Sequence, residues 1–130
     1  MKAKDELVNY WLRSSEIDLN VAESMFNNGH YHYCLFIGHL VLEKTLKAIY
    51  VNRIDNTPPY KHSLVLLASK CDLILSDDQL QFLEEVSDFN LEARYPDEKF
   101  SFHKKCNKEF TQTNLKKIEE IREWLLQPIQ

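Results

Sequence analysis

The sequence predicts an all-α fold: an up-and-down bundle of about five helices with a long antiparallel helix pair at its centre. Two glycines and four prolines among 130 residues are too few for the many tight turns of a β-sandwich or barrel. Apolar residues instead recur every three or four positions over long stretches, which is the period of an amphipathic helix. With 44% hydrophobic residues, the chain is long enough to bury a sizeable core as one domain spanning residues 1–130.

The first two predicted helices cover about residues 5–26 and 30–53 and form the antiparallel pair. The first carries a single apolar stripe and ends at Asn27-Asn28-Gly29, because asparagine and glycine accept the left-handed conformation of a helix end. The second is apolar on nearly every face. Such a helix belongs in the centre of a bundle, or is shared with a second subunit.

Three further helices are predicted over about residues 63–71, 76–94 and 106–126. The middle one opens with a capping box, Ser76-Asp77-Asp78-Gln79, and must end near Arg94 because Pro96 disfavours helical backbone at the preceding residue. Residues 95–105 are predicted to be irregular. A loop of that length in a small domain is often functional.

Composition and charge exclude several classes of protein. The formal charge of −4 argues against a general nucleic-acid coat. Gly29 and Gly38 are the only glycines, so no glycine-rich phosphate-binding loop is possible, and any nucleotide must be held by side chains or helix ends. No stretch is apolar enough for a signal sequence or a membrane span, which indicates a soluble cytoplasmic protein.

The cysteines and histidines give no sign of a metal or another cofactor. Cys34, Cys71 and Cys106 are far apart and are interpreted as reduced, packed thiols. None of the five histidines has a second histidine four residues away on a helix. His30 and His32 are expected to face solvent, and His62 to be a surface group beside a helix cap.

A polar row on the second helix contradicts its otherwise apolar character. His39, Glu43 and Lys47 recur every four residues, with Lys44 alongside. One interpretation is a solvated stripe with a Glu43–Lys47 pair; the other is the floor of an anion-binding groove. Asp18 on the first helix needs a partner if it is buried; Lys44 or Lys47 is the natural candidate, and fixing the helix register is the expected purpose of this pair.

Arg94 and Tyr95 close the fourth predicted helix. An arginine in a last turn suits the helix dipole, but a guanidinium held by a rigid Tyr-Pro turn is also suited to clamp a phosphate. The following segment alternates basic residues, among them His103, with Phe100 and Phe102. This pattern is typical either of a solvated loop pinned by two phenylalanines or of a segment that holds phosphates and stacks bases.

Several motifs, in order along the chain, resemble the HEPN domain family of small α-helical proteins. They are Trp11-Leu12-x5-Asp18-Leu19-x2-Ala22, Gly29-x-Tyr31, Leu42-Glu43-Lys44-x-Leu46-Lys47-Ala48, His62-Ser63-Leu64 and Ala93-Arg94-Tyr95-Pro96-Asp97. The resemblance covers nearly the whole chain. It implies a bundle of about five helices that commonly forms a homodimer, and a frequent partnership with a minimal nucleotidyltransferase in two-component systems, often of toxin–antitoxin type.

The resemblance also implies a test for ribonuclease activity. Several branches of the family cleave RNA without metal, using an arginine followed after four to six residues by a histidine. From Arg94 that spacing reaches Lys99, Phe100 and Ser101, and His103 lies two residues too far along. A histidine suits this proton transfer because its pKa is near neutral.

Three functions therefore remain open. The first is a non-catalytic module that contacts nucleotide or RNA phosphate through Arg94, with Lys44 or Lys47, His39 and Tyr95, beside a nucleotidyltransferase. The second is a metal-independent ribonuclease toxin that uses Arg94 and His103. The third is an interaction domain whose polar row, including Glu43, serves only a dimer interface.

Overall fold

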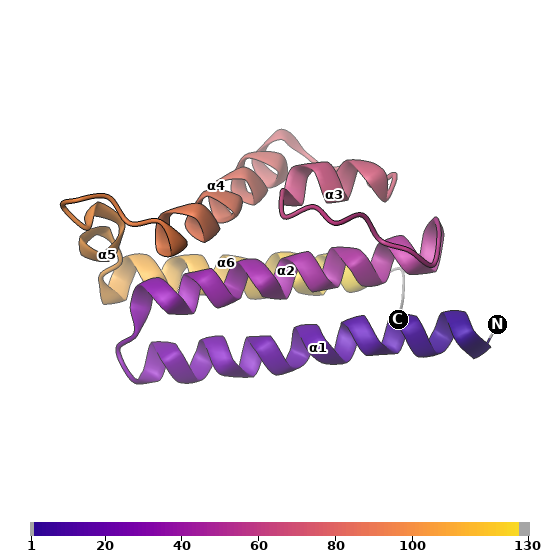
Figure 1. Ribbon diagram of the computed structural model, residues 1–130, viewed down its shortest axis with the longest axis horizontal. Helices are drawn as coiled ribbons and strands as arrows, with labels where there is room; N and C mark the ends of the chain where they lie inside the picture. The colour runs from indigo at the N-terminus through magenta and orange to yellow at the C-terminus, as the bar shows by residue number, and fades with distance from the viewer. Residues whose placement is uncertain (1, 128–130) are drawn as a thin grey trace.

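A computed structural model describes residues 2–127, and in this part of the chain every regular element is a helix. The predicted all-α fold is confirmed. In Figure 1, α1, α2 and α6 lie lengthwise along the molecule, α3 and α4 cover one side, and α5 closes one end. The helices are α1 (Lys2–Asn27), α2 (Tyr31–Arg53), α3 (Leu64–Lys70), α4 (Asp77–Arg94), α5 (Ser101–Lys105) and α6 (Lys108–Leu126).

α1 and α2 form the expected antiparallel pair. Gly29, with φ of 80°, lies in the left-handed region that ends α1, and the His30 amide donates to the Met25 carbonyl at 2.8 Å. The buried face of α1 includes Val8, Ser15 and Ala22, which lie seven residues, or about two helical turns, apart.

α2 is the central helix of the bundle, as its apolar circumference predicts. It packs against all five other helices. Gly38 brings α2 close to α6, since a Cβ atom at this position would lie 2.7 Å from the Ile118 Cδ1 atom. The absence of a side chain at Gly38 therefore sets the spacing of these two helices.

A buried network of hydrogen bonds links α1 and α6 to α2. Ser15 Oγ donates to the Val41 carbonyl at 3.0 Å, lies 2.7 Å from Thr45 Oγ1, and accepts from Arg122 Nε at 3.0 Å. Because buried polar groups are costly without partners, these bonds favour one alignment of the three helices.

α3 and α4 begin as the sequence predicts. The Ser63 hydroxyl accepts from the Leu66 amide, and Ser76 and Gln79 form the full capping box. The two helices are joined by a hydrogen bond from the Leu64 amide to Ser87 Oγ at 3.0 Å. α4 ends at Arg94, as expected from Pro96.

The prediction that residues 95–105 are irregular is wrong in its second half, where α5 forms. The Asp97 carboxylate accepts from the Ser101 amide at 2.8 Å, and Phe102 is buried with its ring stacked on Phe89 at a centroid distance of 5.5 Å. A five-residue helix with one buried anchor has no apolar period to read. The last helix begins at Lys108 rather than at residue 106, because the Asn107 side chain caps it by accepting from the Phe110 amide.

The three cysteines are free and buried. Burial raises the pKa of Cys34 and Cys106 to about 12 and that of Cys71 to about 11. They are therefore unreactive thiols at neutral pH. Within residues 2–127, no helix is both long and apolar enough to cross a membrane.

Candidate functional site

Glu43 is the centre of a buried ionic cluster on α2. Its carboxylate is 5% exposed and lies 3.2 Å from Lys47 Nζ through Oε2 and 2.9 Å from His62 Nδ1 through Oε1. A buried carboxylate is tolerated only when its oxygens are satisfied in this way. The polar row is therefore neither a solvated stripe nor an open groove floor at Glu43, because its charges are matched within the core.

His39 is fully buried beside this carboxylate and is held neutral. Its Nε2 lies 2.7 Å from the His62 carbonyl, and since a carbonyl only accepts, Nε2 carries the proton. Nδ1 is then unprotonated, 3.9 Å from Glu43 Oε1. Burial lowers the pKa of His39, against the opposing influence of its hydrogen bond to the His62 carbonyl and of Glu43.

His62 joins the segment before α3 to this cluster. Because its Nδ1 donates to Glu43 and its side chain is 65% exposed, Nε2 remains free to meet a ligand. His62 is a surface group beside the Ser63 cap, as expected, but its contact with Glu43 was not predicted. Nineteen residues separate it from Glu43, so no local pattern signals the contact.

The two lysines of the polar row are engaged by α1. Lys44 Nζ forms an ion pair with Asp18 at 2.7 Å, and Lys47 Nζ lies 5.2 Å from the centre of the Trp11 ring. Lys44 is one of the two partners expected for Asp18; that the pair sets the helix register remains a prediction. Neither lysine is therefore a free cation.

Arg94 is an exposed cation at the carboxyl-terminal end of α4. It occupies the last turn of α4, and its guanidinium lies 5.5 Å from the centre of the exposed Tyr95 ring. Its neighbours in sequence Ala93 and Pro96 line the same pocket as His32 of α2. Among residues 2–127, no carboxylate lies within ion-pair distance of Arg94, so the guanidinium remains available for an external anion.

His103 lies at the same end of the bundle, folded back by α5. Its ring packs edge-on against His32 at a centroid distance of 4.7 Å. His32 is thus half-buried rather than solvent-facing as expected, and its pKa is lowered by burial and then by His103 and His30. Both histidines line a pocket of about 520 Å³ with Tyr33, Ala93, Pro96, Phe100 and Lys104.

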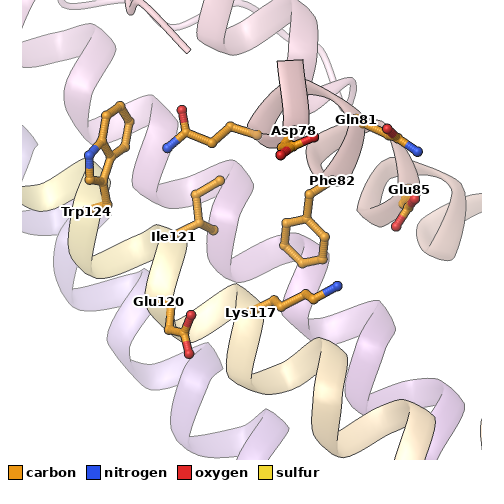
Figure 2. A pocket seen from close by; sticks show the side chains of 9 residues that line it. Asp78, Gln81, Phe82, Glu85, Lys117, Glu120, Ile121 and Trp124 are labelled. Atoms are coloured by element: carbon orange, nitrogen blue, oxygen red, sulfur yellow. The ribbon is translucent and has the colours of Figure 1, made fainter. Parts of the chain in front are cut away.

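A second hollow lies between α4 and α6 and has a different character. It encloses about 580 Å³. Figure 2 shows Ile121 and Trp124 of α6 facing α4, where Phe82 and Asp78 lie, with Glu85 and Glu120 on the rim. Lys117 is 5.8 Å from the centre of the Phe82 ring. Three carboxylates against one lysine make this hollow unsuitable for a phosphate.

The described residues also contain no group of three or more histidine, cysteine or carboxylate side chains arranged to hold a metal ion. The chemistry available at the end of α4 is therefore that of Arg94, its neighbouring imidazoles and exposed aromatic rings. This set suits the recognition of an anion attached to a planar group.

Comparison with known proteins agrees with this fold. The HEPN domain matches residues 8–128, which is nearly the whole chain. The chain belongs to the HEPN domain family. No curated protein matches it. Among solved structures, TT1696 from Thermus thermophilus shares the fold with a TM-score of 0.76, over 91% of this chain and 94% of that one, at 18% sequence identity.

Proposed function

We propose that this HEPN domain protein binds nucleotide or RNA phosphate through Arg94 and serves as the non-catalytic component of a two-component system with a minimal nucleotidyltransferase, of toxin–antitoxin type. The observation that carries the proposal is the state of Arg94. It is exposed and has no carboxylate partner in the described chain. A guanidinium in this state is ready for bidentate contact with a phosphate.

The other phosphate contacts follow from the surroundings of Arg94. Tyr95 is 68% exposed and its ring centre lies 5.5 Å from the guanidinium, whereas the Nε2 of His62 can contact a phosphate only when the imidazole is protonated, since in the neutral ring it is an acceptor. Lys44 and Lys47 act through the core rather than on the ligand, because Asp18 and Glu43 occupy them. His39 likewise orients His62 and is too buried to meet a phosphate itself.

The direct test is the affinity of the Arg94→Ala variant for short single-stranded RNA. Losing a charge-assisted hydrogen bond costs about 1.5–3 kcal/mol, so binding should weaken about tenfold or more. Arg13→Ala is the matched control, since Arg13 is an exposed arginine on α1. Equal binding by wild type and Arg94→Ala, with both folded, contradicts the proposal.

A ribonuclease is the second candidate, and the position of His103 favours it. α5 brings His103 into a pocket that Ala93 and Pro96 also line, and these two residues flank Arg94 in sequence. Toxicity on expression that His103→Ala relieves without unfolding the protein would establish this function. Toxicity that instead disappears in His62→Ala would assign the proton transfer to His62.

A homodimer is part of the proposal, and the outer face of α1 supports it. Tyr10, Ile17 and Val21 are exposed apolar residues spaced by seven and four positions, so they share one face of the helix. The third candidate, an interaction domain without ligand, placed the interface at the polar row; because His39, Glu43 and Lys47 are buried within this chain, such a domain would use the outer face of α1 instead. Sedimentation should give twice the monomer mass; a monomer at high concentration contradicts the dimer.

A further inference from the structure

The pocket lined by His32 and His103, here named the α2–α5 pocket, carries an inference beyond phosphate binding. It lies between the first turn of α2, residues 93–100 and α5. Its volume of about 520 Å³ is in the range of small-molecule sites. Two of its aromatic side chains stay accessible, Tyr33 at 48% and Phe100 at 57% exposure.

Phe100 is held in a backbone conformation that its side chain disfavours. Its φ of 52° lies in the left-handed region, which is uncommon for any residue with a bulky side chain. Its amide donates to the Asp97 carbonyl at 3.1 Å, and its own carbonyl accepts from the Lys104 amide at 3.0 Å. The turn thus buries Phe102 and leaves the Phe100 ring at the pocket, an arrangement of the kind found at ligand-binding sites.

The charges around the pocket distinguish it from the hollow between α4 and α6. Its polar lining consists of Lys104 and the imidazoles of His32 and His103, without a carboxylate. Accessible rings beside a lysine and two imidazoles suit a planar group that carries phosphates. The lining contains no carboxylate that could neutralise a cationic ligand.

The pocket also has a fixed position relative to Arg94. His32 and His39 are seven residues apart and so share one face of α2, separated by about 10 Å along the helix axis. Ala93 and Pro96, close to Arg94 in sequence, line the pocket. A short nucleic-acid strand is long enough to contact both places at once.

We propose that the α2–α5 pocket holds a base of single-stranded RNA, stacked against Phe100 and Tyr33, while Arg94 holds a phosphate of the same strand. This inference rests on the proposed function, since it takes the phosphate from Arg94. The aromatic rings recognise the flat face of a base and the cations its backbone, so the pocket prefers single strands, whose bases are unstacked.

The test compares a short oligoadenylate with a strand of the same length and charge that lacks every base. Wild type should bind the oligoadenylate about five- to tenfold more tightly, which corresponds to one stacked base. Phe100→Ala should remove this preference and leave binding of the base-free strand unchanged. Arg94→Ala should weaken binding of both strands by the same factor. Tyr60→Ala, at a 95% exposed aromatic residue away from this pocket, should change neither.

The outcomes separate the two proposals. Equal binding of the two strands by wild type, or a preference that survives in Phe100→Ala, overturns the base pocket while Arg94 stays the phosphate contact. A preference lost in Phe100→Ala, with both affinities unaffected by Arg94→Ala, supports the pocket and overturns the role of Arg94. If wild type binds neither strand, both proposals are wrong. Phe100→Gly, which suits the left-handed turn, should give the same loss of preference in a protein that is fully folded.

Discussion

The middle of α2 and its amino-terminal end differ in how their polar side chains are used. In the middle, Glu43 and Lys47 neutralise each other inside the core, and Lys44 is paired with α1. At the end, His32 lines a pocket without carboxylates, together with Ala93 and Pro96 on either side of the Arg94-Tyr95 pair. Charged side chains of α2 that are matched by partners stabilise the fold, whereas the unpaired guanidinium of α4 is open to solvent and can meet a ligand. The two regions should therefore respond differently to substitution.

The largest effect is expected from breaking the matched region at Glu43. Glu43→Ala leaves Lys47 and the Nδ1 proton of His62 without their acceptor in a buried site. Removing one partner of a buried pair costs about 3–5 kcal/mol, which the free energy of unfolding in urea will measure.

Two controls sharpen this result. Glu84→Ala removes an exposed carboxylate on α4 and should change stability by less than about 0.5 kcal/mol. Glu43→Gln keeps an oxygen acceptor and should cost less than Glu43→Ala. A loss below about 1 kcal/mol for Glu43→Ala would mean that the cluster is not a structural requirement of the core.

A smaller effect, of opposite sign, is expected at the end of α2. Phe100→Gly should stabilise the protein by about 1 kcal/mol, because glycine accepts the left-handed backbone without strain. Phe100→Ala should not, since alanine keeps the Cβ atom. Thermal unfolding of the two variants measures the difference; a less stable Phe100→Gly protein would show that Phe100 is there for packing.

The smallest effect concerns the pH dependence contributed by His39. Because burial lowers its pKa below 6.5, the unfolded chain binds this proton more readily than the folded one. The contribution of neutral His39 to the free energy of unfolding is therefore complete above pH 6.5. It is lost as the pH falls toward the lower pKa that His39 has in the folded protein. Imidazole NMR should show His39 neutral with the proton on Nε2 at pH 6.5, and His39→Gln should weaken the pH dependence. A His39 that titrates above 6.5 contradicts this assignment.

Much of the fold is predictable because its signals are local. Each of these signals is formed by residues that are close together in the sequence. They are the apolar stripe of α1, the apolar character of α2, the capping box at Ser76 and the helix end before Pro96. The fold class follows from these. α5 does not, because it is fixed by one Asp97 hydrogen bond and one buried ring rather than by a period.

The site was less predictable because its contacts join residues far apart in the chain. The sequence points to Arg94 and to the polar row, and the structure shows that only the first is unpaired. The contacts of Glu43 with His62 and of His32 with His103 span 19 and 71 positions. No spacing rule on a single helix reaches that distance.

The salt dependence of RNA binding tests the central claim most directly. Each phosphate contact with a single strand contributes about 0.7 to the slope of log affinity against log salt concentration. If Arg94 holds a phosphate, Arg94→Ala should bind more weakly and its slope should be shallower by about 0.7, while Arg13→Ala keeps the wild-type slope. The same slope and affinity in wild type and Arg94→Ala would contradict the claim that the unmatched guanidinium is the anion site.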